Sequence, residues 1–238
     1  MKKANLIILV LLLFMSCKKE VRVDFSEEII ETSESADIAL NFPKAKGTED
    51  VINKINKTLE NYIINQMNVS ENEDTNENLQ DAVANFNNEY KSFKNDFPES
   101  AQQWEVFIDG EVTHRSPEII SVAITSYMDT GGAHGNSRVQ FFNFNSQTGE
   151  ELSINDLVGN MEGLSEVIKK KLITEIKTGP DNMENLFFGK DFELPETLGY
   201  SDEGLIVLYN PYEIASYAQG IIEFTIPFEE VNSYLKVN

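Results

Sequence analysis

The sequence predicts an α+β fold, in which a mostly antiparallel sheet packs with about three helices in one compact unit. Some stretches alternate apolar and polar residues with a period of two, and others repeat apolar residues every three or four positions. Many of the predicted strands follow one another directly in the chain, which favours antiparallel pairing over a doubly wound parallel sheet. With 238 residues, 41% hydrophobic and 25% charged, the chain is long enough to bury a sizeable core.

The first half of the chain is predicted to form two strands followed by two helices. Residues 20–32 and 38–42 alternate as strands do, and Pro43 is predicted to end the second strand. From Thr48 the spacing changes to three and four, which predicts a helix with acidic residues in its first turn. A second helix over Leu79–Phe97 has the same spacing, and we interpret its aromatic residues as core.

The second half of the chain is richer in strands. Five more are predicted to complete the sheet, over residues 104–114, 118–128, 139–144, 205–209 and 221–226. A helix containing Leu164 is predicted to stop at Gly179-Pro180. Pro227 is predicted to open a short final helix.

The N-terminus indicates export. Two lysines precede the apolar run Leu6–Met15, which is too short to cross a bilayer, and the only cysteine, Cys17, follows. This order resembles a bacterial lipoprotein signal, with residues 1–16 removed and Cys17 lipidated, although Phe14 stands where leucine is usual. A plain secretory signal or a signal anchor is the alternative. The residues after Cys17 look like the start of lipoproteins of the Bacteroidota. We therefore expect a membrane-anchored lipoprotein of a Gram-negative cell envelope, in the outer membrane or periplasm.

The charge of the chain restricts its partners. Nineteen basic and 40 acidic residues give a net charge of -21, and loss of the two signal lysines makes it -23. Such a surface does not suit nucleic acid or an anionic membrane, so membrane contact is expected through the lipid anchor only. One cysteine and the two histidines, His114 and His134, leave little material for a metal site, and we expect no metal and no cofactor.

Two segments between predicted strands carry the candidate site, residues 127–136 and 209–220. Three glycines within five residues of the first segment predict positive φ angles or the close approach of another segment. We interpret its histidine as holding a tight turn by hydrogen bonds, with a base or metal ligand as the alternative. The candidate ligand-binding residues are Asp129, Gly131, Gly132, His134, Asn136, Tyr209, Tyr212 and Glu213.

The motifs in and around these segments resemble the RsiV-like domain family. They are Gly131-Gly132-Ala133-His134-Gly135, Asn143-Phe144-Asn145, Thr148-Gly149, Leu152–Leu157, Leu205, Asn210–Ala215 and Ile226-Pro227. The resemblance covers residues 118–238. Residues 17–117 resemble, in order but not in motif, the N-terminal domain found in PdaC-type peptidoglycan deacetylases.

This resemblance implies a non-catalytic module that recognises or inhibits a basic lysozyme-like muramidase. A binding module for peptidoglycan or other glycans is the alternative, with stacking residues among Trp104, Tyr209, Tyr212 and Tyr217. An enzyme acting on cell-wall glycans, a hydrolase or deacetylase, is less favoured. It would need an acid pair of Glu213 with Asp202 or Glu203, or an acid–base pair of Asp129 with His134.

Overall fold

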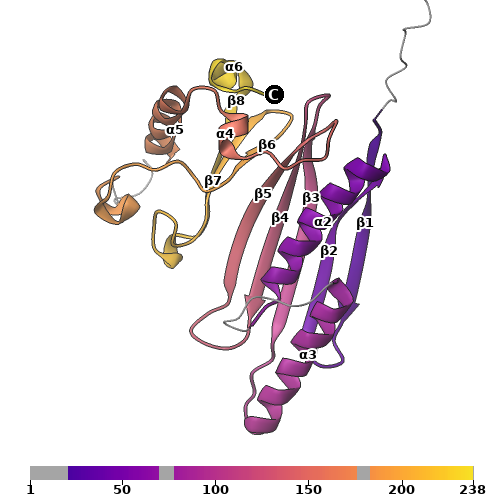
Figure 1. The fold of residues 1–238 in the computed structure, drawn as a ribbon. Coiled ribbons are helices and arrows are strands. Elements are labelled where there is room, and N and C mark those ends of the chain that lie inside the picture. The colour runs from indigo at the N-terminus through magenta and orange to yellow at the C-terminus, as the bar shows by residue number, and fades with distance from the viewer. Residues whose placement is uncertain (1–20, 70–77, 176–182, 238) are drawn as a thin grey trace, which may run out of the picture.

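The computed structural model describes residues 21–69, 78–175 and 183–237. Residues 1–16 and Cys17, most of the acidic 68–78 segment and the predicted helix stop at Gly179-Pro180 lie outside the described residues. The α+β class is confirmed, but the prediction of one sheet is wrong. The strands form a five-stranded sheet in the order β1-β2-β3-β4-β5 and a three-stranded sheet in the order β6-β7-β8 (Figure 1).

Neighbouring strands of the five-stranded sheet are antiparallel, except for one parallel pair. Its strands are β1 (Val23–Thr32), β2 (Asp37–Gly47), β3 (Glu105–Arg115), β4 (Ile119–Asp129) and β5 (Asn136–Asn145). Strands β2 and β3 are parallel because the chain between them crosses over through α2 (Glu49–Gln66) and α3 (Leu79–Asp96).

The predicted end of the second strand at Pro43 is wrong, because β2 continues to Gly47. The pairing of β2 with β3 ends at Asn41, whereas its pairing with β1 continues past Pro43. Proline lacks an N–H group, and it is tolerated here because no neighbouring strand needs that donor.

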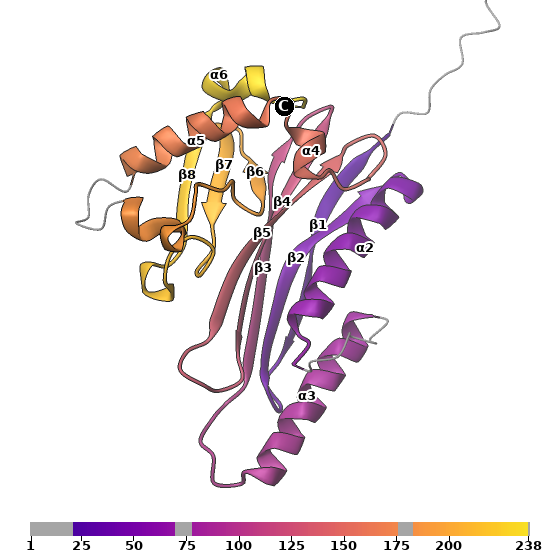
Figure 2. The ribbon, with the colours of Figure 1, turned by 60° about the vertical axis from the view of Figure 1, so that its left-hand side comes forward.

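Both helices cover the same face of the five-stranded sheet (Figure 2). Ile55, Leu59 and Ile63 of α2 are completely buried, as the helical spacing predicted. In α3 the aromatic stripe is core at Phe86 and Tyr90, but Phe97 is 59% exposed. The end of α3 extends beyond the strands in Figure 1, so its last turn has no sheet beneath it.

The remaining elements form a second, smaller part of the protein, residues 152–237, called here the C-terminal unit. Its elements are α4 (Ile154–Leu157), α5 (Met161–Glu175), β6 (Leu198–Tyr200), β7 (Gly204–Tyr209), β8 (Ile222–Pro227) and α6 (Phe228–Val231). The helix around Leu164 and the final helix after Pro227 are confirmed. Strand β6 and helix α4 were not predicted, since three or four residues are too few to show a period.

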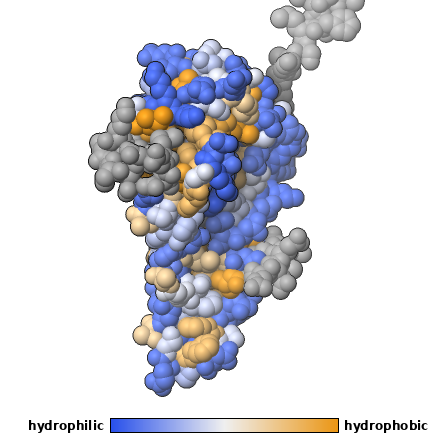
Figure 3. Space-filling model, turned by 90° about the vertical axis from the view of Figure 1, so that its left-hand side faces the viewer, coloured by the Kyte–Doolittle hydropathy of each residue, from blue (hydrophilic) through white to orange (hydrophobic). Residues whose placement is uncertain are grey.

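The hairpin of β4 and β5 joins the two parts because it is buried on both faces. Ile120, Val122 and Ile124 face the core under the helices. On the opposite face, Ala123 and Phe141 pack with β7 of the C-terminal unit. The predicted boundary between residues 117 and 118 falls within the five-stranded sheet. Strands β1, β2 and β3 come from the region before it, and β4 and β5 come from the region after it. Seen from the side of the C-terminal unit, the surface is largely hydrophilic with separate hydrophobic patches (Figure 3).

Candidate functional site

The loop between β4 and β5, residues 129–136, is called here the glycine loop, and its glycines have the two roles predicted for them. Gly131 and Gly132 have φ angles of +98° and +135°, which L side chains rarely adopt. The N–H of Gly131 donates to Oδ1 of Asp129 at 2.8 Å. A Cβ atom on Gly135 would lie 2.4 Å from the hydroxyl of Tyr127, so a side chain at this position would require the Tyr127 ring to shift. The glycines therefore shape the loop and do not by themselves indicate a ligand.

The histidine of this loop does hold a turn by a hydrogen bond. Nδ1 of His134 lies 2.8 Å from the carbonyl oxygen of Gly135, so we assign the proton to Nδ1. Nε2 is then the acceptor for the hydroxyl of Tyr212, at 3.3 Å. The imidazole also stacks on the ring of Tyr217, with centroids 3.6 Å apart and planes 14° apart.

The connection between β7 and β8, residues 210–221, is called here the tyrosine loop, and it lies against the glycine loop. The hydroxyl of Tyr217 donates to the Gly135 carbonyl at 3.0 Å. Tyr212 is 57% exposed and has a φ angle of +68°, a strained value for a residue with a side chain. The buried side chains of Ile214 and Ala215 anchor the loop in the core of the C-terminal unit.

Together the two loops present an aromatic group at the surface, His134, Tyr212 and Tyr217, which we call the loop pair. Residues that are 78 to 83 positions apart in the sequence thus meet at one place. Tyr127 lies directly beneath the glycine loop, and its partial burial and the nearby carboxylates of Glu105 and Asp129 raise the pKa of its hydroxyl. Asn136 is exposed at the start of β5.

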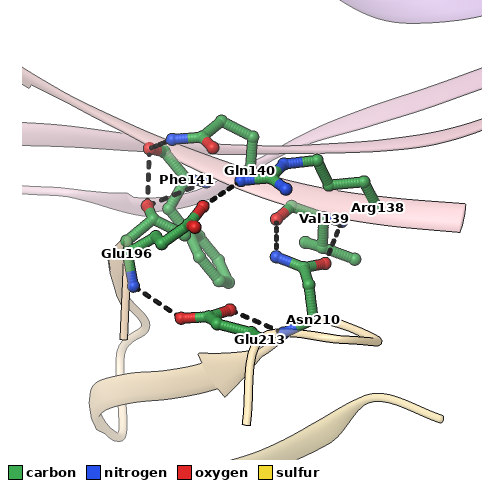
Figure 4. Close-up of polar contacts among 8 residues, drawn as sticks. Arg138, Val139, Gln140, Phe141, Glu196, Asn210 and Glu213 are labelled. Atoms are coloured by element: carbon green, nitrogen blue, oxygen red, sulfur yellow. Dashed lines mark hydrogen bonds and ion pairs between the residues drawn. The ribbon is translucent and has the colours of Figure 1, made fainter. Parts of the chain in front are cut away.

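Strand β5 continues from the glycine loop, and side chains of the C-terminal unit form hydrogen bonds along its outer edge, in an arrangement we call the seam (Figure 4). The amide of Asn210 accepts the N–H of Val139 at 2.8 Å and donates to its carbonyl at 3.0 Å. The hydroxyl of Thr197 does the same for Phe141, at 3.2 and 2.9 Å. These side chains take the place of a sixth strand, because they form hydrogen bonds with N–H and carbonyl groups at the edge of β5 that would otherwise lack a partner strand.

Glu213 stabilises the seam by accepting hydrogen bonds from two backbone N–H groups. Its two carboxylate oxygens accept the N–H groups of Asn210 at 2.8 Å and Glu196 at 2.7 Å. Burial raises the pKa of Glu213, while the two backbone N–H groups oppose that rise. Glu196 in turn forms an ion pair with Arg138 of β5. Both oxygens of Glu213 are occupied by the fold, so its position indicates a structural role.

Two of the predicted stacking residues are buried. Tyr209 is completely buried, its hydroxyl donates to the carbonyl of Glu193 at 3.0 Å, and burial raises its pKa. Trp104 is 9% exposed and packs against Phe86, Tyr90 and Phe93. Neither ring presents a face to a ligand, because each belongs to a hydrophobic core. Tyr212 and Tyr217 are the two predicted aromatic residues that reach the surface.

The predicted acid pairs do not assemble. Oδ1 of Asp202 lies 3.0 Å from Nδ1 of His114, at the end of β7 opposite to Glu213. Asp129 contacts Gly131 and Gln102, whereas His134 contacts Gly135 and Tyr212. Among the described residues, no group of three or more His, Cys, Asp and Glu side chains is placed to hold a metal ion. Within the same ranges, no helix has the length and apolar character needed to cross a membrane.

The fold and the site define an α+β protein of two joined parts that presents an aromatic loop pair drawn from both parts. Residues 29–137 match the family described as Deacetylase PdaC. Residues 155–229 match the family described as Protein of unknown function (DUF3298). The whole glycine loop lies in the region that matches the first family, and the whole tyrosine loop lies in the region that matches the second.

The fold is shared with solved structures, among them two of the DUF3298 family. One is a DUF3298 family protein from Pseudomonas aeruginosa PAO1, 18% identical, with a TM-score of 0.59. The other is a DUF3298 family member from Bacteroides fragilis NCTC 9343, also 18% identical, with a TM-score of 0.65. Each alignment covers 92% of this chain and 95% of the other, and at this identity the likeness shows the fold alone. No curated protein matches the chain.

Proposed function

We propose that this protein is a non-catalytic, lipid-anchored binding protein of the cell envelope, and that its ligand contacts the loop pair. The observation that carries this proposal is the exposed, strained Tyr212, whose ring stacks with His134 and packs at a tilt against Tyr217. Strained backbone persists where the surrounding structure holds it, and such positions cluster at functional sites. Binding residues commonly lie on loops that a rigid scaffold positions, as the seam does here.

We propose a basic muramidase of the lysozyme type as the ligand. Without its signal the chain carries a net charge of -23, and a basic partner would be steered toward it. The matches to a deacetylase family named PdaC and to DUF3298 fit a cell-wall-related role. The resemblance of the loop motifs to the RsiV-like family supports this choice of partner.

The proposed anchor is Cys17 in the outer membrane or periplasm of a Gram-negative bacterium. The first strand begins at Val23, six residues after the cysteine. A lipidated Cys17 would therefore hold the domain close to the membrane surface, with two or three acyl chains giving stable attachment. Metabolic labelling with a palmitate analogue tests this, and a Cys17→Ser variant is expected to lose the label.

Binding to immobilised lysozyme tests the proposed ligand, with the mature chain 18–238, which contains every described residue. We expect saturable binding that survives about 0.3 M salt, where long-range attraction between charges is screened. Tyr212→Ala and His134→Ala are expected to weaken it at least tenfold, since truncation of a central aromatic hot-spot residue typically costs about 2 kcal/mol or more. Phe97→Ala removes a similarly exposed ring from the end of α3 and is expected to bind normally. Binding seen only at low salt would contradict the proposal.

A glycan-binding module is the second candidate, and the cluster of the Tyr212, Tyr217 and His134 rings is the observation in its favour. Aromatic faces are suited to packing against sugar rings, and Tyr212 is accessible to a large ligand. Sedimentation with insoluble peptidoglycan distinguishes the two candidates. Retention that is lost in Tyr212→Ala while lysozyme fails to bind would favour the glycan module.

A further inference from the structure

The five-stranded sheet has a second face that α2 and α3 do not cover. On this face the strand register places Ile29, Asn41, Asp109 and Thr125 in one row across β1 to β4. The next row contains Glu31, Ala39, Phe107 and Tyr127. We call these two rows, together with Asp37 and Glu105 at their end, the open face. The C-terminal unit packs on the other half of β4, from Ile119 to Ala123, whereas in this half Thr125 is exposed and Tyr127 is half-buried.

The open face is partly apolar and contains a groove. Ile29 is 57% exposed and Phe107 is 41% exposed. The groove has a volume of about 440 Å³ and runs between the turn after β1 and the ring of Phe107. Ala39 and Phe107 contribute to its apolar part, and Glu31 and Asp37 are also among the residues that line it.

The charge of this surface has one sign. The acidic residues of the open face are Glu31, Asp37, Glu105 and Asp109, and its two rows contain no lysine or arginine. In the described part of the chain, none of these four carboxylates forms an ion pair. By contrast, Glu28, which directly precedes Ile29 on β1, forms an ion pair with Lys44. The open face thus combines an apolar floor with acidic groups that lack a basic partner.

We propose that the open face docks a basic, extended segment of another protein, with a lysine or arginine side chain in the groove. The aliphatic stem of such a side chain would pack on Phe107 and Ala39, and its charged end would reach Glu31 and Asp37. The face of Phe107 also attracts a cation. A second copy of this chain does not fit, because it would bring carboxylates against carboxylates. This proposal goes beyond the loop pair, since it uses another surface and requires no muramidase.

The experiment measures binding of a fluorescent peptide of alternating lysine and threonine to the mature chain, near 0.15 M salt. Successive side chains of an extended peptide point to opposite sides, so the alternation places every lysine on the side that would contact the open face. A peptide with glutamate in place of lysine is the probe control. We expect saturable binding of the lysine peptide alone, about fivefold weaker in the double variant Glu31→Gln/Asp37→Asn, as two exposed ion pairs contribute.

A matched variant separates this effect from net charge. Glu229→Gln/Glu230→Gln removes the same charge from exposed positions of α6, at the opposite end of the molecule in Figure 1, and is expected to bind normally. Phe107→Ala is expected to weaken binding without changing the charge. Equal weakening by both double variants would overturn the proposal in favour of general charge attraction. Sedimentation showing dimers of the free chain that Phe107→Ala abolishes would also overturn it.

Discussion

The seam and the loop pair share the tyrosine loop, but they use its side chains in opposite ways. In the seam, Asn210 is 4% exposed and Glu213 has both oxygens hydrogen-bonded to backbone N–H groups. Tyr212 lies between these two residues, and it is 57% exposed on a strained backbone. One short motif therefore contains both the residues that fix the loop and the residue that it presents. Mutations in the seam should change stability, whereas mutations in the loop pair should change binding.

The largest effect is expected where the C-terminal unit packs on β5. Phe141 is 5% exposed, and its ring lies so close to Gly199 that a Cβ there would be 2.4 Å from it. Phe141→Ala is expected to lower the free energy of unfolding by about 3–5 kcal/mol, because it opens a cavity between the two parts. Urea unfolding measures this. Phe107→Ala on the open face is the control, with an expected loss below about 1 kcal/mol.

The next effect tests the hydrogen bonds of the seam. Asn210→Ala leaves the N–H and the carbonyl of Val139 without their partner in a buried position. Since each unsatisfied group costs about 1–3 kcal/mol, we expect a loss of about 2–4 kcal/mol in unfolding free energy. Asn232→Ala, at an exposed position after α6, should cost little. If both variants unfold at the same urea concentration, the seam does not stabilise the fold.

A smaller effect with a distinctive sign is expected at Tyr212. Tyr212→Gly and Tyr212→Ala both remove the ring, but only glycine relieves the positive φ angle. We expect the glycine variant to be more stable than the alanine variant by about 1 kcal/mol, the cost of a left-handed residue with a side chain. Both variants should lose lysozyme binding equally. A less stable glycine variant would show that the backbone at this position is not strained.

The smallest effect is a change in pH dependence at Glu213. Burial raises its pKa in the folded protein above the ordinary value of 4.5, so the folded state holds the proton more tightly than the unfolded state. Its ionisation therefore costs stability, and the cost appears as the pH rises from 4.5 through the raised pKa. In Glu213→Gln this fall in unfolding free energy should be smaller. Urea titrations between about pH 4 and 7 measure it. Glu223→Gln, which is exposed on β8, should keep the wild-type slope.

Local periodicity was sufficient to predict most of the elements. The helix around Ile55 and Leu59, and the strands around Ile124 and Phe142, carry their period in consecutive residues. The glycine positions were also informative, because positive φ and close approach are properties of a short segment. Pro43 misled the prediction, since proline breaks a strand only where a neighbour needs its N–H.

The partners of each residue could not be predicted in this way. Tyr209 and Tyr212 are three positions apart in one motif, yet one is completely buried and the other is 57% exposed. The sequence also did not reveal Phe107 as an exposed residue, although it alternates with acidic residues along β3. From the sequence alone, an apolar residue on a strand is interpreted as a core residue, because the sequence does not show which face of the sheet is covered by other elements.

By itself the sequence determined the α+β class, the two loops as the candidate site and the strongly acidic charge. These properties depend on composition and on residues that are near one another in the chain. Only the tertiary structure decided that the strands form two sheets and that His134 stacks on Tyr217. The reason is that the two sheets and the ring contact both depend on tertiary packing, in which β4 and β5 contribute side chains to two hydrophobic cores. The contacts of this packing join residues more than 50 positions apart in the chain.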